Sequence, residues 1–256
     1  MKTQLKKSKK NTVPFWKRTL FIFVPFILWE SLILLRPFVV NTPCSSHPEN
    51  CKTSEVNFVD SVSIGLSNPK LDHLSYITQD LAGVFALIVV IFLARKAKNG
   101  LSKNEFLRDL GFLLQVTGIN GLLTETTRII AQRPRPFVYE SPAYLGANPW
   151  HYNSFVSGHT SFTAAMSTAV AFILIRHRVK IIPFLLVGLA SQALVFATGV
   201  FRVVSGRHFP SDIIGAFIVG TFAAIIAYVS VRNFSLQQDQ TFDLTQTERT
   251  HFAPLA

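Results

Sequence analysis

Three observations predict an all-α fold, a polytopic membrane bundle with six transmembrane helices. Of the 256 residues, 49% are hydrophobic and only 15% are charged, and the mean hydropathy is +0.34, whereas soluble domains carry about 25% charged residues. Six predominantly apolar runs each approach the roughly 20 residues that cross a bilayer. The net charge is +11, and the positive residues cluster in tails and short loops beside these runs. Positive residues in such positions set the orientation of a membrane protein. We therefore do not expect nucleic acid as a partner.

The first 18 residues form a basic segment that we expect to be a cytoplasmic tail. An apolar run at residues 19–35 follows, an order that is also found in cleaved signal peptides. This run is long, contains Glu30 and lacks a small-residue cleavage site, so we interpret it as a retained first helix. Glu30 and Arg36 are expected to form a packing or snorkelling pair.

Residues 37–76 form a polar loop that holds the only two cysteines of the chain, Cys44 and Cys51. Two cysteines close in sequence, in a loop that faces outward, can form a disulfide in an oxidising compartment. The alternative is a pair of free thiols. We expect the disulfide.

Five further apolar runs complete a membrane domain over residues 19–231, at residues 77–94, 106–126, 157–175, 181–201 and 212–231. The basic connections at 95–108 and 176–180 belong on the cytoplasmic side. This orientation places both termini in the cytoplasm and the cysteine loop outside, in a bacterial inner membrane. The polar tail at residues 232–256 is expected to be disordered.

Several arginines break this orientation rule, because they lie in the junctions predicted to face outward. The first such junction ends in Gln132-Arg133-Pro134-Arg135-Pro136 and also contains Arg128. Arginine offers a planar fork of donors that matches phosphate oxygens, and the prolines stiffen the loop that carries it. The alternative is a basic patch that binds lipid headgroups at the surface.

The second junction, Ser157-Gly158-His159, stands at the expected start of a helix, which is a natural anion site. Ser157 can donate to a phosphate oxygen, Gly158 allows close backbone approach, and His159 can give a proton near neutral pH. The alternative is an ordinary serine cap followed by an interfacial histidine.

The third junction contains Arg202, His208 and Asp212. His208 and Asp212 are four residues apart, so the carboxylate is expected to orient one imidazole nitrogen and leave the other as a nucleophile. The alternative is a His–Asp cap at a helix start.

Together the three junctions supply what phosphoryl transfer requires: positive donors around the phosphate oxygens, a nucleophile and an acid for the leaving oxygen. A metal site is not expected, because the motif histidines and aspartate stand among arginines whose charge opposes a cation.

These motifs resemble those of the type 2 phosphatidic acid phosphatase superfamily, the lipid phosphate phosphatases, which carry Lys-x6-Arg-Pro, Pro-Ser-Gly-His and Ser-Arg-x5-His-x3-Asp. In this chain they read Arg128-x6-Arg135-Pro136, Val156-Ser157-Gly158-His159 and Phe201-Arg202-x5-His208-x3-Asp212. The resemblance implies a His208 nucleophile that forms a phosphohistidine, oriented by Asp212, with His159 protonating the leaving group. It implies phosphate ligands at Arg128, Arg135, Arg202, Ser157 and the Gly158 amide, and neither metal nor cofactor.

Three positions depart from the family pattern, Arg128 for Lys, Val156 for Pro and Phe201 for Ser, and none removes a catalytic group. The resemblance therefore implies an integral membrane phosphatase that hydrolyses a lipid phosphate or pyrophosphate at the non-cytoplasmic face. Phosphatidate, phosphatidylglycerophosphate, undecaprenyl pyrophosphate, lipid A and sphingoid phosphates stay open as substrates. The alternatives are a lipid phosphotransferase of the same family, and a transporter or anionic-lipid-binding protein. Against the last, the charges lie at one surface and no internal repeat is evident.

Overall fold

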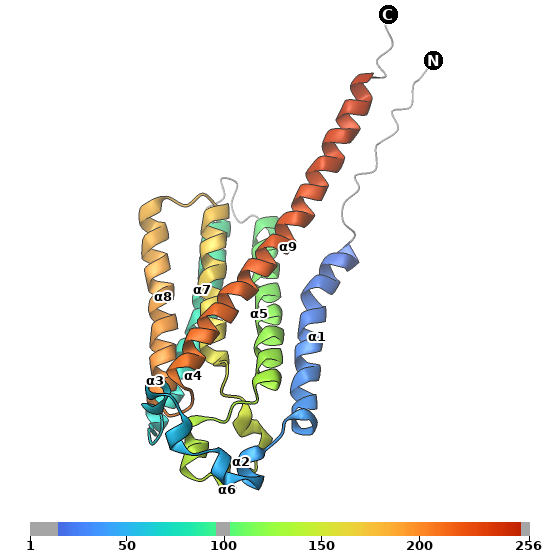
Figure 1. The fold of residues 1–256 in the computed structure, drawn as a ribbon. Helices are drawn as coiled ribbons and strands as arrows, with labels where there is room; N and C mark the ends of the chain where they lie inside the picture. The colour runs from blue at the N-terminus through green and yellow to red at the C-terminus, as the bar shows by residue number, and fades with distance from the viewer. Residues whose placement is uncertain (1–14, 96–102, 252–256) are drawn as a thin grey trace, which may run out of the picture.

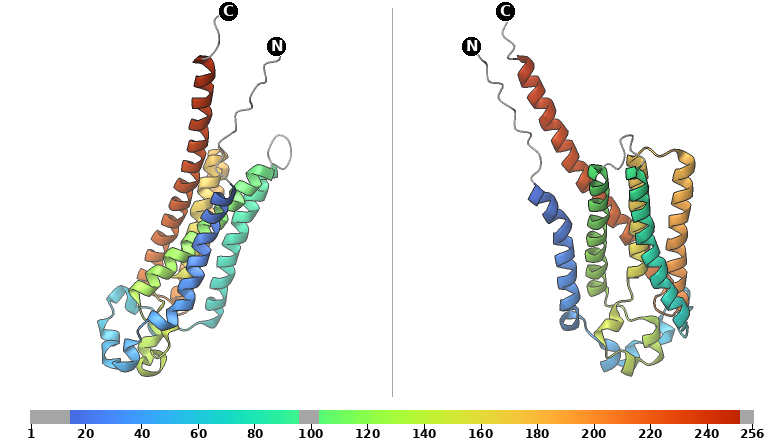
Figure 2. Two further views of the ribbon diagram at one scale, coloured as in Figure 1. Left: turned by 90° about the vertical axis from the view of Figure 1, so that its right-hand side faces the viewer. Right: turned by 180° about the vertical axis from the view of Figure 1, so that it is seen from behind.

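The computed structural model describes residues 15–95 and 103–251, and within them the chain is helical without strands. Short helices gather at one end of the bundle (Figures 1 and 2); we call this end, residues 40–68 and 132–157, the cap. The all-α prediction is confirmed. The long helices are α1 (Phe15–Val39), α4 (Pro69–Arg95), α5 (Lys103–Ala131), α7 (Gly158–Arg176), α8 (Ile181–Val204) and α9 (Pro210–His251). The cap contains α2 (Pro43–Ser46), η1 (Pro48–Asn50), η2 (Thr53–Glu55), α3 (Phe58–Ser61), η3 (Pro136–Glu140), α6 (Pro142–Leu145) and η4 (Pro149–Tyr152).

Five of the long helices, α1, α4, α7, α8 and α9, are long and apolar enough to cross a membrane. The sixth, α5, has 29 residues but does not meet the same limit. Its polar side chains Gln115, Asn120, Thr124 and Glu125 are buried, and α5 packs against α1, α4, α7 and α9. A helix enclosed by other helices can be less apolar than one facing lipid. We treat α5 as the sixth crossing.

Helix α7 is the centre of the bundle and packs against α4, α5, α8 and α9. Its buried face is rich in small residues, including Ala164, Ala165 and Ala169. The backbone of Ser161 on α7 occupies the place that a Cβ on Gly220 of α9 would take. Small residues thus bring the two backbones close together, as is common in membrane bundles.

Two predicted boundaries were wrong. The loop expected to last until Tyr76 ends earlier, because α4 begins at Pro69; proline suits a first helical position, and hydropathy alone misses a polar first turn. Residues 232–251, expected to be disordered, continue α9 as a helix, because polar residues such as Gln, Glu and Arg still favour helix. The basic segment up to residue 14, residues 96–102 and residues 252–256 lie outside the described residues.

The pairing expected between Glu30 and Arg36 was also wrong. Glu30 is exposed, whereas Arg36 is buried and forms an ion pair with Glu125 of α5. A spacing of six residues places two side chains on different faces of a helix. The ion pair instead ties the cap end of α1 to α5.

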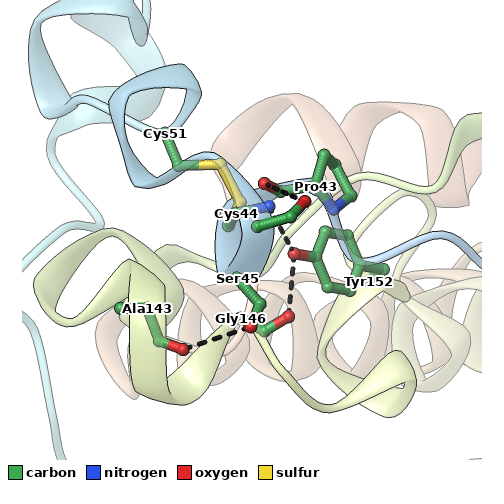
Figure 3. Close-up of a disulfide and its surroundings, with 8 residues drawn as sticks. Pro43, Cys44, Ser45, Cys51, Ala143, Gly146 and Tyr152 are labelled. Atoms are coloured by element: carbon green, nitrogen blue, oxygen red, sulfur yellow. Dashed lines mark hydrogen bonds between the residues drawn. A yellow bond between two sulfur atoms is a disulfide. The ribbon is translucent and has the colours of Figure 1, made fainter.

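A disulfide joins Cys44 to Cys51 within the first half of the cap, residues 40–68 (Figure 3). The backbone N–H of Cys44 donates to the hydroxyl of Tyr152 (3.0 Å), which in turn donates to the carbonyl of Gly146 (3.0 Å). Both cysteines pack with Val138 and Tyr152 in one buried cluster. The segment before α4 therefore supports the segment before α7.

Candidate active site

The three charged junctions of the sequence meet where the bundle joins the cap (Figure 1). Arg128 lies in the last turn of α5, and its Nε donates to the carbonyl of Val156 (3.0 Å), just before α7. The backbone N–H of Ser157 lies 3.4 Å from the carbonyl of Asp212, in the first turn of α9. These contacts bring the ends of α5, α7 and α9 together.

His208 lies in the turn between α8 and α9 and is fully buried. Its Nδ1 lies 2.7 Å from the carbonyl oxygen of Ser154. A carbonyl only accepts, so Nδ1 carries the proton and Nε2 keeps its lone pair. Within the described part of the chain, Nε2 has no hydrogen-bond partner. Burial lowers the pKa of His208 well below its usual 6.5, and the charges of nearby arginines lower this pKa further, in the order Arg202, Arg135, Arg128.

The Asp212 carboxylate lies beside the His208 ring, but its shortest contacts are to other groups. Its Oδ2 lies 3.6 Å from Nδ1, and it accepts from the hydroxyl of Ser154 (2.6 Å) and the backbone N–H of Phe209 (2.8 Å). Asp212 is the third residue of α9, a position from which a carboxylate reaches back to the residue before the helix. It therefore fixes the backbone on both sides of the imidazole and acts on the ring through Ser154.

Arg133 is a site residue that the sequence motifs did not single out. Its Nη1 donates to Asp212 Oδ1 and to Ser211 Oγ (2.7 Å each), and its Nη2 donates to Asp60 Oδ2 (2.7 Å). Burial by itself would raise the pKa of Asp60, but hydrogen bonds from Arg133 and Ser211 bring it below its usual value. The repeated Arg-Pro pair was the only sequence signal, and nothing pointed to Asp60.

Arg202 is buried at the end of α8 and reaches across to α4. Its Nη1 donates to Asp72 (2.5 Å), while its Nε has no hydrogen-bond partner among the residues described. The other carboxylate oxygen of Asp72 accepts from Arg207 Nε (3.0 Å). The Asp72 carboxylate thus holds two arginines of the third junction. The sequence predicted Asp72 in the polar loop at residues 37–76, whereas it lies in the first turn of α4.

A cavity of about 260 Å³ opens beside these groups. Arg128, Arg135, Arg202, Gly158 and His159, all predicted site residues, line it. The Nε2 atom of His159 is buried and has no hydrogen-bond partner in the described ranges. Three predicted site residues, Ser157, His208 and Asp212, are buried and do not line the cavity; the hydroxyl of Ser157 lies 3.1 Å from that of Thr160.

Three arginines line the cavity, and no carboxylate of the described residues lines it. Arg135 donates from Nε to the neutral amide oxygen of Asn153 (2.6 Å), and no carboxylate of the described chain lies within ion-pair distance of it. Burial lowers the pKa of Arg135 to about 9, together with the charges of Arg202, Arg128 and Arg207. A buried cluster of like charges is stabilised by an anion, and guanidinium groups match phosphate oxygens.

The family model described as the PAP2 superfamily matches residues 109–235, which include α7, α8 and most of α5. The chain belongs to the PAP2 superfamily.

Two characterised proteins are similar in sequence. One is a lipid A 1-phosphatase of Rhizobium etli, 28% identical over 166 residues, which cover 60% of this chain and 67% of the relative. The other is phosphatidylglycerophosphatase B of Bacillus subtilis, 29% identical over 147 residues, which cover 52% of this chain and 61% of the relative. A solved structure of a transmembrane PAP2-type phosphatidylglycerolphosphate phosphatase from Bacillus subtilis is 18% identical, with a TM-score of 0.43 over 84% of this chain and 97% of that one.

Proposed function

We propose that the chain is a membrane phosphatase that hydrolyses a lipid phosphate through a phosphohistidine on His208, without a metal ion. The observation that carries the proposal is the state of His208: the Ser154 carbonyl holds Nδ1, and Nε2 has no partner among the described residues. The arginines that lower its pKa also line the cavity. The similarity to a lipid A 1-phosphatase and to a phosphatidylglycerophosphatase supports a lipid phosphate as the substrate.

In the first step, the lone pair of His208 Nε2 attacks phosphorus and forms a P–N bond. The bond between phosphorus and the lipid oxygen breaks, its electron pair stays on that oxygen, and His159 supplies the proton. Arg128, Arg135 and Arg202 bind the non-bridging oxygens, with the backbone N–H of Gly158 and the hydroxyl of Ser157 as further donors. In the second step, water gives a proton to His159 and attacks phosphorus, which releases phosphate and restores both histidines.

The sidedness of the reaction follows from the charge pattern. The cap and the arginine-rich site lie at one end of the bundle, and the C-terminal end of α4, the N-terminal end of α5 and the basic connection 176–180 lie at the other (Figure 2). Basic loops favour the cytoplasmic side. We therefore assign the site to the non-cytoplasmic face of the membrane, with the termini on the cytoplasmic side.

The test is phosphate release by the purified full-length chain from diacylglycerol phosphate in detergent micelles, with and without a chelator. We expect release that the chelator does not change, and a phosphoenzyme that is labile in acid but stable in alkali. A phosphoenzyme absent under rapid quenching, or activity lost to the chelator and restored by a metal, would refute this mechanism. Binding of the lipid without release would favour a binding or transport protein.

The pH profile should show a nucleophile that resists protonation. Because burial and the arginines depress the pKa of His208, its neutral form persists below pH 6.5. We expect the acid limb of kcat/KM, measured by phosphate release, to lie below this value. The unfolded chain regains the usual pKa, so this histidine also makes stability fall as pH drops below about 6.5. An acid limb at or above 6.5 would contradict the assignment.

Gly158→Ala should damage phosphate binding. A Cβ at Gly158 would lie 2.6 Å from Nη2 and 3.3 Å from Cζ of Arg128, whose Nε is fixed by Val156. Displacing a charge-assisted hydrogen bond costs about 1.5–3 kcal/mol, so we expect kcat/KM to fall by roughly 10- to 100-fold. Gly188→Ala on α8 is the matched control, because nothing lies within 4 Å of its added Cβ. Equal activity of the two variants would show that Arg128 does not need this space.

A further inference from the structure

The cavity at the phosphate site continues along α5 into the depth of the bundle. Its lining on α5 runs from Arg128 back to Thr117, which is about 16 Å along a helix axis. All of the charged side chains that line it, Arg128, Arg135 and Arg202, belong to the phosphate site. The deeper wall instead carries neutral polar groups, including Asn120 of α5 and Gln79 of α4. Polar groups at this depth are costly unless they have partners, so they are functional candidates.

The orientation of the Asn120 side-chain amide follows from its hydrogen bonds. The hydroxyl of Ser161 donates to Asn120 Oδ1. Because that hydroxyl has only one proton, the hydroxyl of Thr124, 3.0 Å away, is the donor to Ser161. These two hydrogen bonds fix Oδ1 toward Ser161 of α7, so Nδ2 of the same amide points away from Ser161. Asn120 is only 4% exposed and lines the cavity, and we see no protein partner for Nδ2 among the described residues.

Asn120 also lies at a suitable level below the proposed phosphate site. The side chain of Arg128 turns back along α5, so that Nη1 lies 3.7 Å from Glu125, as long helical side chains commonly do. Its guanidinium is therefore near the level of Thr124, and Asn120 is one turn deeper, about 6 Å along the axis. An acyl carbonyl follows the phosphate by a few bonds in a diacylglycerol phosphate. A polyprenyl phosphate has only hydrocarbon at this level.

We infer that Asn120 is a specificity-determining residue, which donates from Nδ2 to an acyl carbonyl of the substrate and selects acylated lipid phosphates over polyprenyl phosphates. This inference rests on the proposed function. A second phosphate group of a lipid pyrophosphate is a poorer match, because it would be charged and no cation lines the cavity at this level. A buried amide N–H without an acceptor is costly, so a substrate that lacks the carbonyl is rejected.

The test compares diacylglycerol phosphate with its dialkyl ether analogue, which differs only in the two carbonyl groups, and with undecaprenyl phosphate and pyrophosphate. With the unaltered chain in mixed micelles, we expect kcat/KM for the diacyl lipid to exceed that for the ether lipid by about 10-fold or more. Asn120→Leu should lower kcat/KM for the diacyl lipid to the ether value and leave the ether value unchanged.

Thr117→Val is the matched control in the same cavity, because the Thr117 hydroxyl already donates to the carbonyl of Leu113 (2.9 Å). It should keep the preference for the diacyl lipid. Equal turnover of ester and ether lipids by the unaltered chain, or a loss in Asn120→Leu that is the same for both, would overturn the carbonyl contact alone. Failure to release phosphate from every lipid would overturn the proposed function with it.

Discussion

His208→Asn is expected to lower kcat for phosphate release by about 10⁴-fold or more, the order found when a covalent nucleophile is removed. The asparagine amide can still donate to the Ser154 carbonyl, which accepts from Nδ1 of the histidine, so the turn between α8 and α9 keeps its hydrogen bond. The variant lacks the lone pair that forms the P–N bond. Phosphate release, acid-labile phosphoenzyme and the melting temperature should be measured together.

His151→Asn is the matched control for this variant. Its Nδ1 also lies close to a backbone carbonyl, that of Leu145 (2.6 Å), but in the cap away from the cavity. We expect it to retain activity within a few fold. If His208→Asn folds and still forms the phosphoenzyme, His208 is not the nucleophile.

Arg133→Gln is expected to have the largest effect on stability. The substitution leaves Asp60 and Asp212, which are 1% and 0% exposed, without their charged partner. Removing one partner of a buried ion pair costs about 3–5 kcal/mol, because the remaining charge stays buried. Phosphate release should fall as well, because Asp212 positions Ser154 and through it His208. Chemical denaturation and phosphate release are the measurements.

Adding Asp60→Asn to Arg133→Gln should recover part of the lost stability, since one of the two stranded carboxylates is then neutral. Arg207→Gln is the control for stability, because 41% of its side chain is exposed and exposed pairs contribute at most about 1 kcal/mol. A loss in Arg133→Gln no larger than in Arg207→Gln would show that the buried network contributes little.

The sequence predicted the helices because a membrane-spanning segment is a local signal, about 20 apolar residues long. Five runs of this kind correspond to helices that meet the same criterion in the structure. The boundary of α4 was predicted too late, because Pro69 and the polar residues after it are hydrophilic yet helical. The continuation of α9 was missed for the same reason.

For the site, the motifs predicted which residues gather but not how they are held. Arg128, Arg135, Arg202 and His159 all line one cavity. The partners that hold Arg133 and Arg202, Asp60 and Asp72, are 73 and 130 residues away in sequence. No periodicity or spacing reports such contacts. The spacing of four residues placed the Asp212 carboxylate beside His208, but it did not predict the closer donors Ser154 and Phe209.

The match to the PAP2 superfamily begins at residue 109, and this position divides the chain into an upstream and a downstream stretch. Every proposed catalytic group follows it, whereas α1, the first half of the cap and α4 precede it. These earlier segments nevertheless contribute Trp29, Tyr76 and Gln79 to the cavity. The upstream stretch thus shapes part of the cavity wall, whereas the proposed catalytic groups and Asn120 lie on the downstream stretch. Substitutions at these upstream positions can therefore change the shape of the cavity without altering a proposed catalytic group.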